Sequence, residues 1–164
     1  KKLLFMGGEF GQWGEWDHDQ ALEWHLLQYL PHQGLQRWVR DLNAFYRNHP
    51  ALYEKDFTPE GFEWIDFKDA DNSVISYLRK GVNPDDPILV VCNFTPVPRQ
   101  GYRIGVPRAG CWIERLNSDS VDFGGSGHGG NHTAEAKPEP FHGRPDSIVI
   151  SLPPLSVMFF ENRP

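Results

Sequence analysis

The stretch FEWIDFKDADNSVISYLRKGVNPDDPILVVCNF, residues 62–94, holds three short segments rich in β-branched and aromatic residues, separated by clusters of Asp, Asn, Gly and Pro. Such segments predict β-strands, and the clusters between them predict turns. Four more segments of this kind follow: YRIGV at 102–106, CWIERLN at 111–117, SIVISL at 147–152 and LSVMFF at 155–160. Several short strands at this spacing favour an antiparallel β-sandwich or a similar barrel.

A glycine-rich segment, GGSGHGG at residues 124–130, interrupts these strands. It neither follows an apolar strand nor opens a helix, so it predicts a loop tip and not a phosphate-binding turn. His128 and His132 lie in or beside it, but no carboxylate or thiol pattern accompanies them. We expect solvent-exposed loop histidines here and no metal site.

The first third of the chain has a different pattern. Leu3–Met6 is a continuous apolar run closed by two glycines, which is typical of a strand buried on both faces in a parallel sheet. Apolar residues at helical spacing from Leu35 to Tyr46 predict an amphipathic helix that ends at His49, before a proline. Between them, residues 13–30 have no clean period and predict a loop with at most a short helix.

A single parallel strand cannot form a fold, because parallel strands need neighbours that are reached through helical crossovers. The sequence supplies no second unit of this kind. We therefore predict two parts: residues 1–53 as the end of an α/β domain, and residues 54–164 as an antiparallel β domain. The chain is expected to be the tail of a longer protein, and residues 1–53 are expected to be poorly ordered or mispacked without the rest of it.

Composition narrows the function classes. The formal net charge is −6, from 16 Lys and Arg against 22 Asp and Glu, and the pI is about 5.6. This balance argues against nucleic acid or an anionic membrane as the partner and favours a neutral or small ligand. No apolar run has the length of a membrane span or a signal peptide, so we expect a cytoplasmic protein.

The candidate site follows the predicted strand at Leu3–Met6. Acidic and aromatic side chains just after the carboxyl end of a barrel strand are where α/β barrels contact substrate. Indole faces stack on the C–H faces of sugar rings, while carboxylates accept hydrogen bonds from hydroxyl groups, so this mixture suits a neutral carbohydrate. The alternative is that the tryptophans pack under the loop and the acids face water. The predicted substrate-binding residues are Glu9, Trp13, Trp16 and Asp17.

The other tryptophans are predicted to be core residues: Trp24, Trp38, Trp64 and Trp112. Trp38 lies on the apolar face of the predicted helix, and the last two alternate with polar neighbours in strands. The two cysteines, Cys92 and Cys111, lie in strand segments without a second ligand pair, so we expect reduced core thiols, although a disulfide is possible.

Motifs along the whole chain resemble one family. These are KKLLFMGGEFGQWGEWDHDQALEWHLL, GLQRWVRDLNAFYRNHPAL, GFEWIDFKD, VVCNFTPVPRQGYRIGVP and LNSDS. In this order they closely resemble the C-terminal part of the bacterial 1,4-alpha-glucan (glycogen) branching enzymes, members of the alpha-amylase superfamily. The resemblance implies that residues 2–7 are the eighth strand of a (β/α)8 barrel, that residues 33–49 belong to the helix after it, and that the remainder is a C-terminal β-sandwich.

The resemblance also implies a retaining transglycosylation that transfers alpha-1,4-glucan segments to form alpha-1,6 branches, without a cofactor. The family carries its catalytic carboxylates on earlier barrel strands, which lie outside these residues. His18-Asp19 is only superficially similar to the family's His-Asp pair, since that pair follows the seventh strand. We therefore predict no catalytic residue in this chain and no activity for it alone.

Two functional hypotheses remain. In the first, the chain is the C-terminal part of a branching enzyme, with glycogen or amylose and the preceding part of the barrel as its partners. In the second, it is an independent carbohydrate-binding β-sandwich module. An independent module should expose an aromatic pair on the sandwich, whereas the sequence places its exposed-looking tryptophans in residues 13–24.

Overall fold

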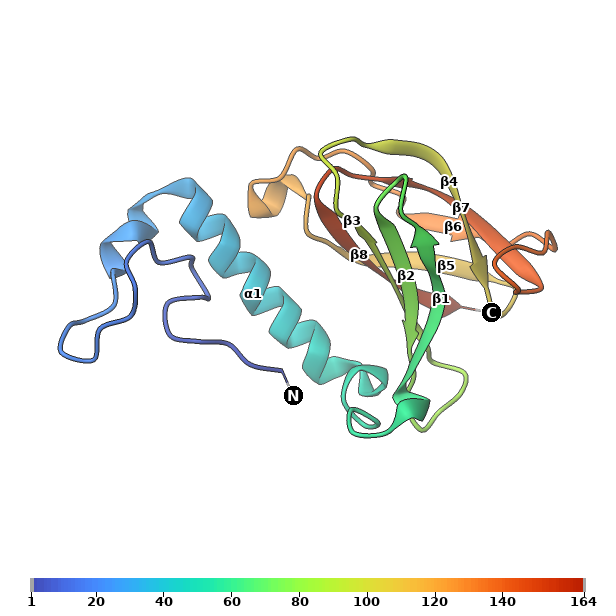
Figure 1. Ribbon diagram of the computed structural model, residues 1–164, viewed down its shortest axis with the longest axis horizontal. Coiled ribbons are helices and arrows are strands. Elements are labelled where there is room, and N and C mark those ends of the chain that lie inside the picture. The colour runs from blue at the N-terminus through green and yellow to red at the C-terminus, as the bar shows by residue number, and fades with distance from the viewer. Residues whose placement is uncertain (1, 164) are drawn as a thin grey trace.

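The computed structural model describes residues 2–163 and has two parts (Figure 1): an N-terminal loop with a long helix, and a β-sandwich. The strands are β1 (Phe62–Asp69), β2 (Val74–Arg79), β3 (Ile88–Asn93), β4 (Arg99–Val106), β5 (Cys111–Asn117), β6 (Thr133–Glu135), β7 (Asp146–Leu152) and β8 (Ser156–Arg163). Six form one sheet in the order β1-β2-β3-β8-β5-β6, and β4 pairs with β7 in a second sheet. All these pairings are antiparallel, which confirms the predicted fold class.

The sandwich core lies between the two sheets. Side chains alternate between buried and half-buried along β2, because successive residues of a strand point to opposite faces. Trp112 and Phe160 are fully buried at the centre, together with Ile104 and Ile148 from the smaller sheet. The sequence predicted every strand except β6, whose three residues are too short to show a period.

Helix α1 (Leu30–Asn48) covers the outer face of the larger sheet (Figure 1). Phe45 packs there with Ile88 and Val90 of β3, and Phe159 of β8 joins this second apolar cluster. Strand β3 is therefore buried on both faces, which explains its unbroken apolar sequence. The helix ends before His49-Pro50, as predicted.

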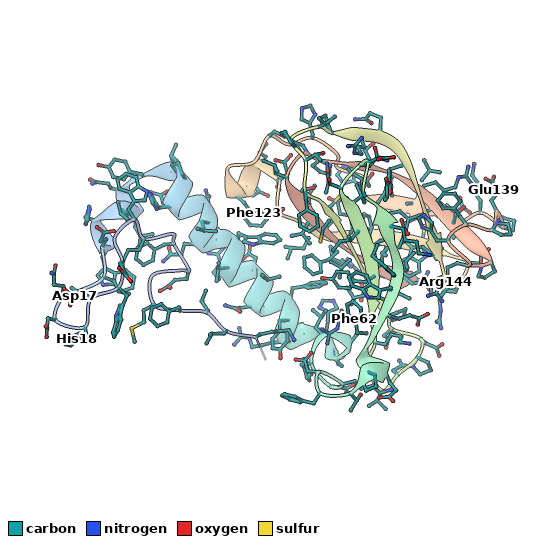
Figure 2. All side chains as sticks on the ribbon, viewed as in Figure 1. Asp17, His18, Phe62, Phe123, Glu139 and Arg144 are labelled. Carbon is teal, nitrogen blue, oxygen red and sulfur yellow. The ribbon has the colours of Figure 1, made fainter. Side chains whose placement is uncertain are left out.

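Four short 3-10 helices complete the structure: η1 (Trp24–Gln28), η2 (Pro50–Leu52), η3 (Pro59–Gly61) and η4 (Val121–Phe123). The η4 turn contacts the middle of α1 (Figure 2). The ring of Phe123 meets Trp38 edge-on at 5.2 Å between centroids, and its carbonyl oxygen approaches Gly34 so closely that a Cβ there would lie 2.2 Å away. The sandwich thus holds the helix through a contact that only glycine permits.

The predicted strand at Leu3–Met6 is wrong for this chain. These four residues form no strand, and their side chains are 53 to 89% exposed. A strand needs a neighbour to pair its backbone N–H and C=O groups, and residues 2–163 offer none at this position. The apolar run is therefore left uncovered among the described residues.

Two of the four core tryptophan predictions are also wrong. Trp112 is buried and Trp38 is half-buried under Phe123 and Phe159. Trp24 packs against Phe10 but is still 52% exposed. Trp64 is 44% exposed because the edge strand β1 has no helix over it.

The remaining expectations concern the thiols, the glycine segment and the helices. Cys92 and Cys111 are free and half-buried, and burial raises the pKa of the Cys92 thiol to about 11. The segment 124–130 is a loop, as predicted. Within residues 2–163, no helix combines the length and apolar character that crossing a bilayer requires.

Candidate functional site

The loop of residues 7–28, here called the N-terminal loop, is anchored at Phe10. This side chain is fully buried, and its ring packs on Trp24 at 5.1 Å between centroids. The carbonyl oxygen of Phe10 accepts a hydrogen bond from Nδ1 of His32, which is 2.8 Å away in the first turns of α1. His32 itself is 7% exposed. A buried polar group needs such a partner, so this bond ties the loop to the helix.

A second set of hydrogen bonds closes the loop on itself. Oε2 of Glu23 accepts from the backbone N–H groups of Trp13 and Gly14, at 3.0 and 2.9 Å. The backbone N–H of Glu23 in turn donates to Oε1 of Gln12 at 3.0 Å, and Nε2 of Gln12 donates to the carbonyl oxygen of Gly14 at 3.1 Å. These bonds fix the backbone at Trp13, since bonds to a charged acceptor are the stronger kind.

The two tryptophans predicted as sugar platforms are both accessible. Trp13 is 75% exposed and lies nearly parallel to Tyr29, with an angle of 20° between the rings, while His32 supports it edge-on at 5.2 Å. Trp16 is 38% exposed and leans on Phe5 at 5.5 Å. One face of Trp13 is thus presented to solvent by aromatic neighbours behind it, as stacking on a sugar ring requires.

The two predicted carboxylates differ in setting. Glu9 is half-buried, and among the described residues its side chain makes no hydrogen bond or ion pair. Asp17 lies at the tip of the loop, where Oδ1 accepts from the backbone N–H of Asp19 at 2.9 Å and Oδ2 accepts from Nε2 of Gln20 at 2.9 Å. Glu9 is free to accept hydrogen bonds from a ligand, whereas Asp17 already organises its own turn.

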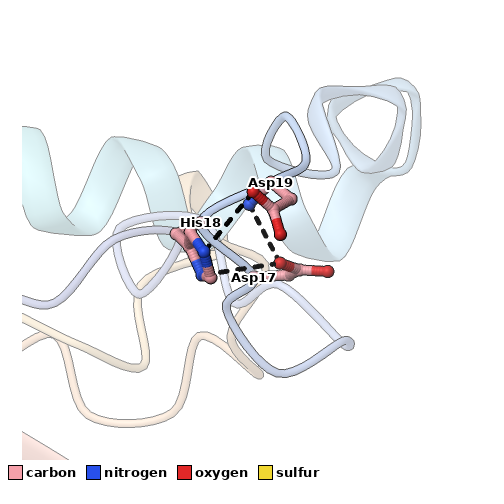
Figure 3. Close-up of side chains that lie close together, drawn as sticks. All are labelled: Asp17, His18 and Asp19. Carbon is pink, nitrogen blue, oxygen red and sulfur yellow. Dashed lines mark hydrogen bonds and ion pairs between the residues drawn. The ribbon is translucent and has the colours of Figure 1, made fainter.

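Asp17, His18 and Asp19 lie close together at this tip (Figure 3). The Nε2 atom of His18 is 3.4 Å from Asp19 and its Nδ1 atom is 3.9 Å from Asp17. One potential ligand atom of each residue lies within 4.8 Å of the others, but all three side chains are exposed. The cluster is the tip of a surface turn (Figure 2), and it gives no reason to change the expectation of no metal site.

The structure does not gather the four predicted residues in one cavity. Asp17 borders a pocket of about 190 Å³ together with Gln12 and Glu23, but Glu9, Trp13 and Trp16 do not line it. Sequence reasoning missed Tyr29 and His32 behind Trp13, and the Glu23 bridge. The structure begins α1 at Leu30, before the predicted helix, and this places His32 in its first turns.

The sandwich carries an exposed aromatic cluster of its own, formed by Phe62, Trp64, Phe67 and Tyr77 of β1 and β2. Phe62 stacks on Tyr77 at 5.0 Å, and Trp64 meets both of these rings nearly edge-on. The sequence did not reveal this cluster. Because Trp64 stands nearly perpendicular to Phe62 and Tyr77, the rings do not form a single flat platform.

An apolar groove of about 490 Å³ lies beside this cluster. Residues 2–4 form one side, α1 forms a second side and the outer face of the larger sheet forms the floor. Tyr77 lines the groove and also belongs to the aromatic cluster, so the two are continuous. Its remaining apolar lining comes from Leu3, Leu4, Val39, Leu42, Tyr46, Leu52, Val90 and Phe159.

Residues 64–163 match the model of the family described as alpha amylase, C-terminal all-beta domain. The chain belongs to this family. The fold agrees, since an alpha-amylase from H. orenii superposes with a TM-score of 0.51 at 17% identity over 89% of this chain and 24% of that one.

Closer relatives align with the whole chain or nearly all of it. Proteins named 1,4-alpha-glucan branching enzyme are 57% identical over 99% of the chain in Aquifex aeolicus and 55% identical over 100% of it in Albidiferax ferrireducens. The family member described here spans 26% of the length of each of these two relatives.

Proposed function

We propose that this chain is the C-terminal piece of a 1,4-alpha-glucan branching enzyme, a glycosyltransferase that forms alpha-1,6 branches in glycogen. One observation carries the proposal: the chain is 57% identical, over 99% of its length, to a relative of that name, of which it spans 26%. We also propose that the protein acts in the cytoplasm.

Within this proposal the N-terminal loop contacts glucan. The exposed face of Trp13 stacks on a sugar ring, and the unpaired carboxylate of Glu9 accepts hydrogen bonds from sugar hydroxyls. Trp16 and Asp17 extend this contact toward the tip of the loop. No residue of this chain is assigned to bond cleavage, because retaining transfer needs a nucleophile and an acid that act as a pair, and we place that pair in the preceding part of the polypeptide.

The sandwich has a supporting role. We assign residues 1–53 to the end of the catalytic barrel and residues 54–164 to the sandwich domain. The support runs from η4 through Gly34 and Trp38 into α1, and from His32 of α1 to the backbone beside Glu9. A displacement of α1 on the sandwich would therefore move the loop that contacts glucan.

The groove and the aromatic cluster form the surface on which the rest of the barrel packs. Relatives are about four times as long as this chain, since it spans 26% of them, so most of the polypeptide is available to cover these residues. Leu3 and Leu4 line the groove and belong to the segment expected to be a barrel strand. An apolar surface of this extent is normally covered in a soluble protein.

The test is a branching assay on amylose, by iodine staining and by counting branch points, with this chain and with the chain extended upstream to its natural start. We expect branching only from the extended protein. In the extended protein, Glu9→Gln and Trp13→Ala should raise KM for amylose, with Glu15→Gln, an exposed acid on the same loop, as the control. Branching by the 164 residues alone would overturn the assignment of catalysis to the missing part.

A second candidate function is the independent carbohydrate-binding module, and the exposed cluster around Trp64 favours it. The two functions differ in what covers this cluster. If the cluster is a glucan platform, Trp64→Ala in the isolated chain abolishes binding of maltoheptaose. If it is the surface that meets the barrel, the same change leaves glucan binding intact and destabilises only the extended protein.

A further inference from the structure

A cleft of about 710 Å³ opens on the sandwich where the edge strand β1 of the larger sheet meets β4 of the smaller sheet. It lies between the end of β1, the β1–β2 turn, β4 and the turn at Phe141-His142. Helix α1 and the apolar groove lie on the outer face of the larger sheet, whereas this cleft includes β4 of the smaller sheet. Its polar lining includes Asp66, Asp69, Asn72, Arg99, Tyr102 and His142.

Irregular strand pairing shapes the cleft from both sides. The pairing of β4 with β7 shifts register between Arg99 and Tyr102, where Gly101 adopts a φ of 66°. The pairing of β1 with β2 shifts register on both sides of Asp66. Bulges re-aim side chains and are common beside functional sites. They also protect edge strands from pairing. Here the bulge in β4 places the exposed Gly101, which has no side chain, at the border of the cleft, where a Cβ would meet no atom within 4 Å.

Asp69 organises the floor of the cleft. Oδ2 of Asp69 accepts from the hydroxyl of Tyr102 at 2.6 Å, and both carboxylate oxygens accept from Nδ2 of Asn72 at 2.9 and 2.8 Å. Burial by itself raises the pKa of Asp69, but these hydrogen bonds outweigh it and hold the pKa below its usual value. Asp69 is therefore ionised at neutral pH, and its four hydrogen bonds, which include one from the backbone N–H of Asn72 at 3.2 Å, fix the floor of the cleft. Oδ2 of Asp66 accepts no hydrogen bond among residues 2–163, so Asp66 is the carboxylate that is open to a ligand.

Other polar groups in the cleft have hydrogen-bonding atoms without a partner. Nη2 of Arg99 donates to the carbonyl oxygen of Asn72 at 3.1 Å, but its Nε–H is buried and has no partner among the described residues. Nε2 of His142 lies 3.7 Å from Asp66, and burial lowers the pKa of His142, so the imidazole is neutral at pH 7. The ring of Phe141, 40% exposed, stands beside His142 at 4.2 Å.

These groups match the needs of a sugar. Two carboxylates and two cations, Lys68 and Arg99, leave the cleft without net charge, since Arg103 is paired with Glu139. A ligand with a net charge therefore gains little electrostatic attraction in the cleft. Hydroxyl groups can both donate to a carboxylate and accept from a guanidinium, and Phe141 offers a ring for stacking. The volume is that of a small-molecule site.

We propose that this cleft binds a short segment of a neutral polyhydroxylated chain, an alpha-1,4-glucan, at a site separate from the N-terminal loop. The identity of the ligand rests on the proposed function, whereas the site itself rests on the geometry of the cleft. A second contact on one glucan chain raises the local concentration of that chain at the first.

The test is titration of the 164-residue chain with maltoheptaose, followed by calorimetry and by backbone amide NMR. Gly101→Asn fills the open space with a residue that tolerates positive φ. Gly124→Asn is the matched control. Gly124 also has a positive φ, of 84°, a Cβ there would also meet no atom within 4 Å, and the residue lies outside the cleft. We expect at least tenfold weaker binding for the first variant and unchanged binding for the second.

A second pair of variants guards against misfolding at Gly101. Phe141→Ala should weaken binding at least threefold, whereas Phe57→Ala, which removes a 79% exposed ring outside the cleft, should not. The proposal is overturned if the unmodified chain does not bind maltoheptaose at millimolar concentration. It is equally overturned if binding survives Phe141→Ala unchanged, or is lost in Trp13→Ala or Trp64→Ala instead. None of these results alters the branching assay of the extended protein, so the two proposals fail separately.

Discussion

Replacing Gly34 by alanine tests whether the sandwich holds α1 through close backbone contact. A Cβ at this position would lie 2.2 Å from the carbonyl oxygen of Phe123 and 2.8 Å from its carbon. Contacts below 3.0 Å essentially never occur, so the turn and the helix must separate by at least ~0.8 Å. Both partners are backbone, so this overpacking costs about 3 kcal/mol. Alanine returns about 1 kcal/mol of helix propensity, which leaves a net loss of about 2 kcal/mol.

The assay is thermal and urea unfolding of the 164-residue chain. For a chain of this length, a loss of about 2 kcal/mol lowers Tm by roughly 4 to 8 °C. Amide exchange should speed up in residues 117–125, which form the turn, and at Trp38. Arg37→Ala, on the exposed side of the same helix, is the control and should change Tm by less than about 2 °C. An unchanged or higher Tm for Gly34→Ala would refute the reasoning. Helix propensity alone predicts a higher Tm, because alanine favours the helix more than glycine does.

Three further predictions concern other contacts. Glu23→Ala removes the acceptor of two backbone N–H groups, so amide exchange at Trp13 and Gly14 should accelerate at least tenfold while Tm falls by only a few degrees; unchanged exchange would show that the bridge does not hold the loop. Burial alone raises the pKa of Asp56, but hydrogen bonds from Lys2 and Arg79 outweigh it and hold the pKa low. Asp56→Asn should therefore cost about 1 to 3 kcal/mol at pH 7. Urea unfolding should show this difference shrinking as the pH falls below about 4, where the unfolded chain takes up its proton, until the folded carboxylate is also protonated at its lower pKa. Trp112→Ala opens the centre of the sandwich and should cost about 3 to 5 kcal/mol by urea unfolding; a loss below about 1 kcal/mol would place the core elsewhere.

The sequence predicted the elements whose signals are local. Strands such as β2 show their alternation within a few residues, and the helix that ends at His49 shows its period and its proline. The strand predicted at Leu3–Met6 failed because pairing is not local: an apolar run becomes a strand only where another strand lies beside it. The same residues are expected to pair once the rest of the barrel is present.

Exposure was harder to predict than secondary structure. Trp64 and Trp112 both alternate with polar neighbours, yet one is 44% exposed and the other is fully buried. The difference comes from the face of the sheet, since Trp112 belongs to the core between the sheets, whereas Trp64 pairs with Tyr77, which packs on the outer face. A single-strand pattern does not contain that information.

The residues that contact glucan stay a prediction, and the contacts that support them could not be predicted from the sequence. The aromatic and acidic composition of the N-terminal loop led to the choice of Trp13 and Glu9, while the bonds made by Glu23 and His32 depend on how the loop closes. The sequence did not predict the cleft beside Gly101, for a related reason. A bulge is a property of two paired strands, and neither β1 nor β4 carries its signal alone.

Deleting residues 57–164 from the extended protein tests the central claim most directly, namely that the sandwich supports a glucan-contacting loop and does not perform the chemistry. The deletion removes both the outer sheet face under Phe45 and the turn that meets Gly34. We predict that the truncated protein loses cooperative thermal unfolding and branching of amylose together, and that adding the separate sandwich does not restore either fully. Normal folding with undiminished branching in the truncated protein would contradict the account.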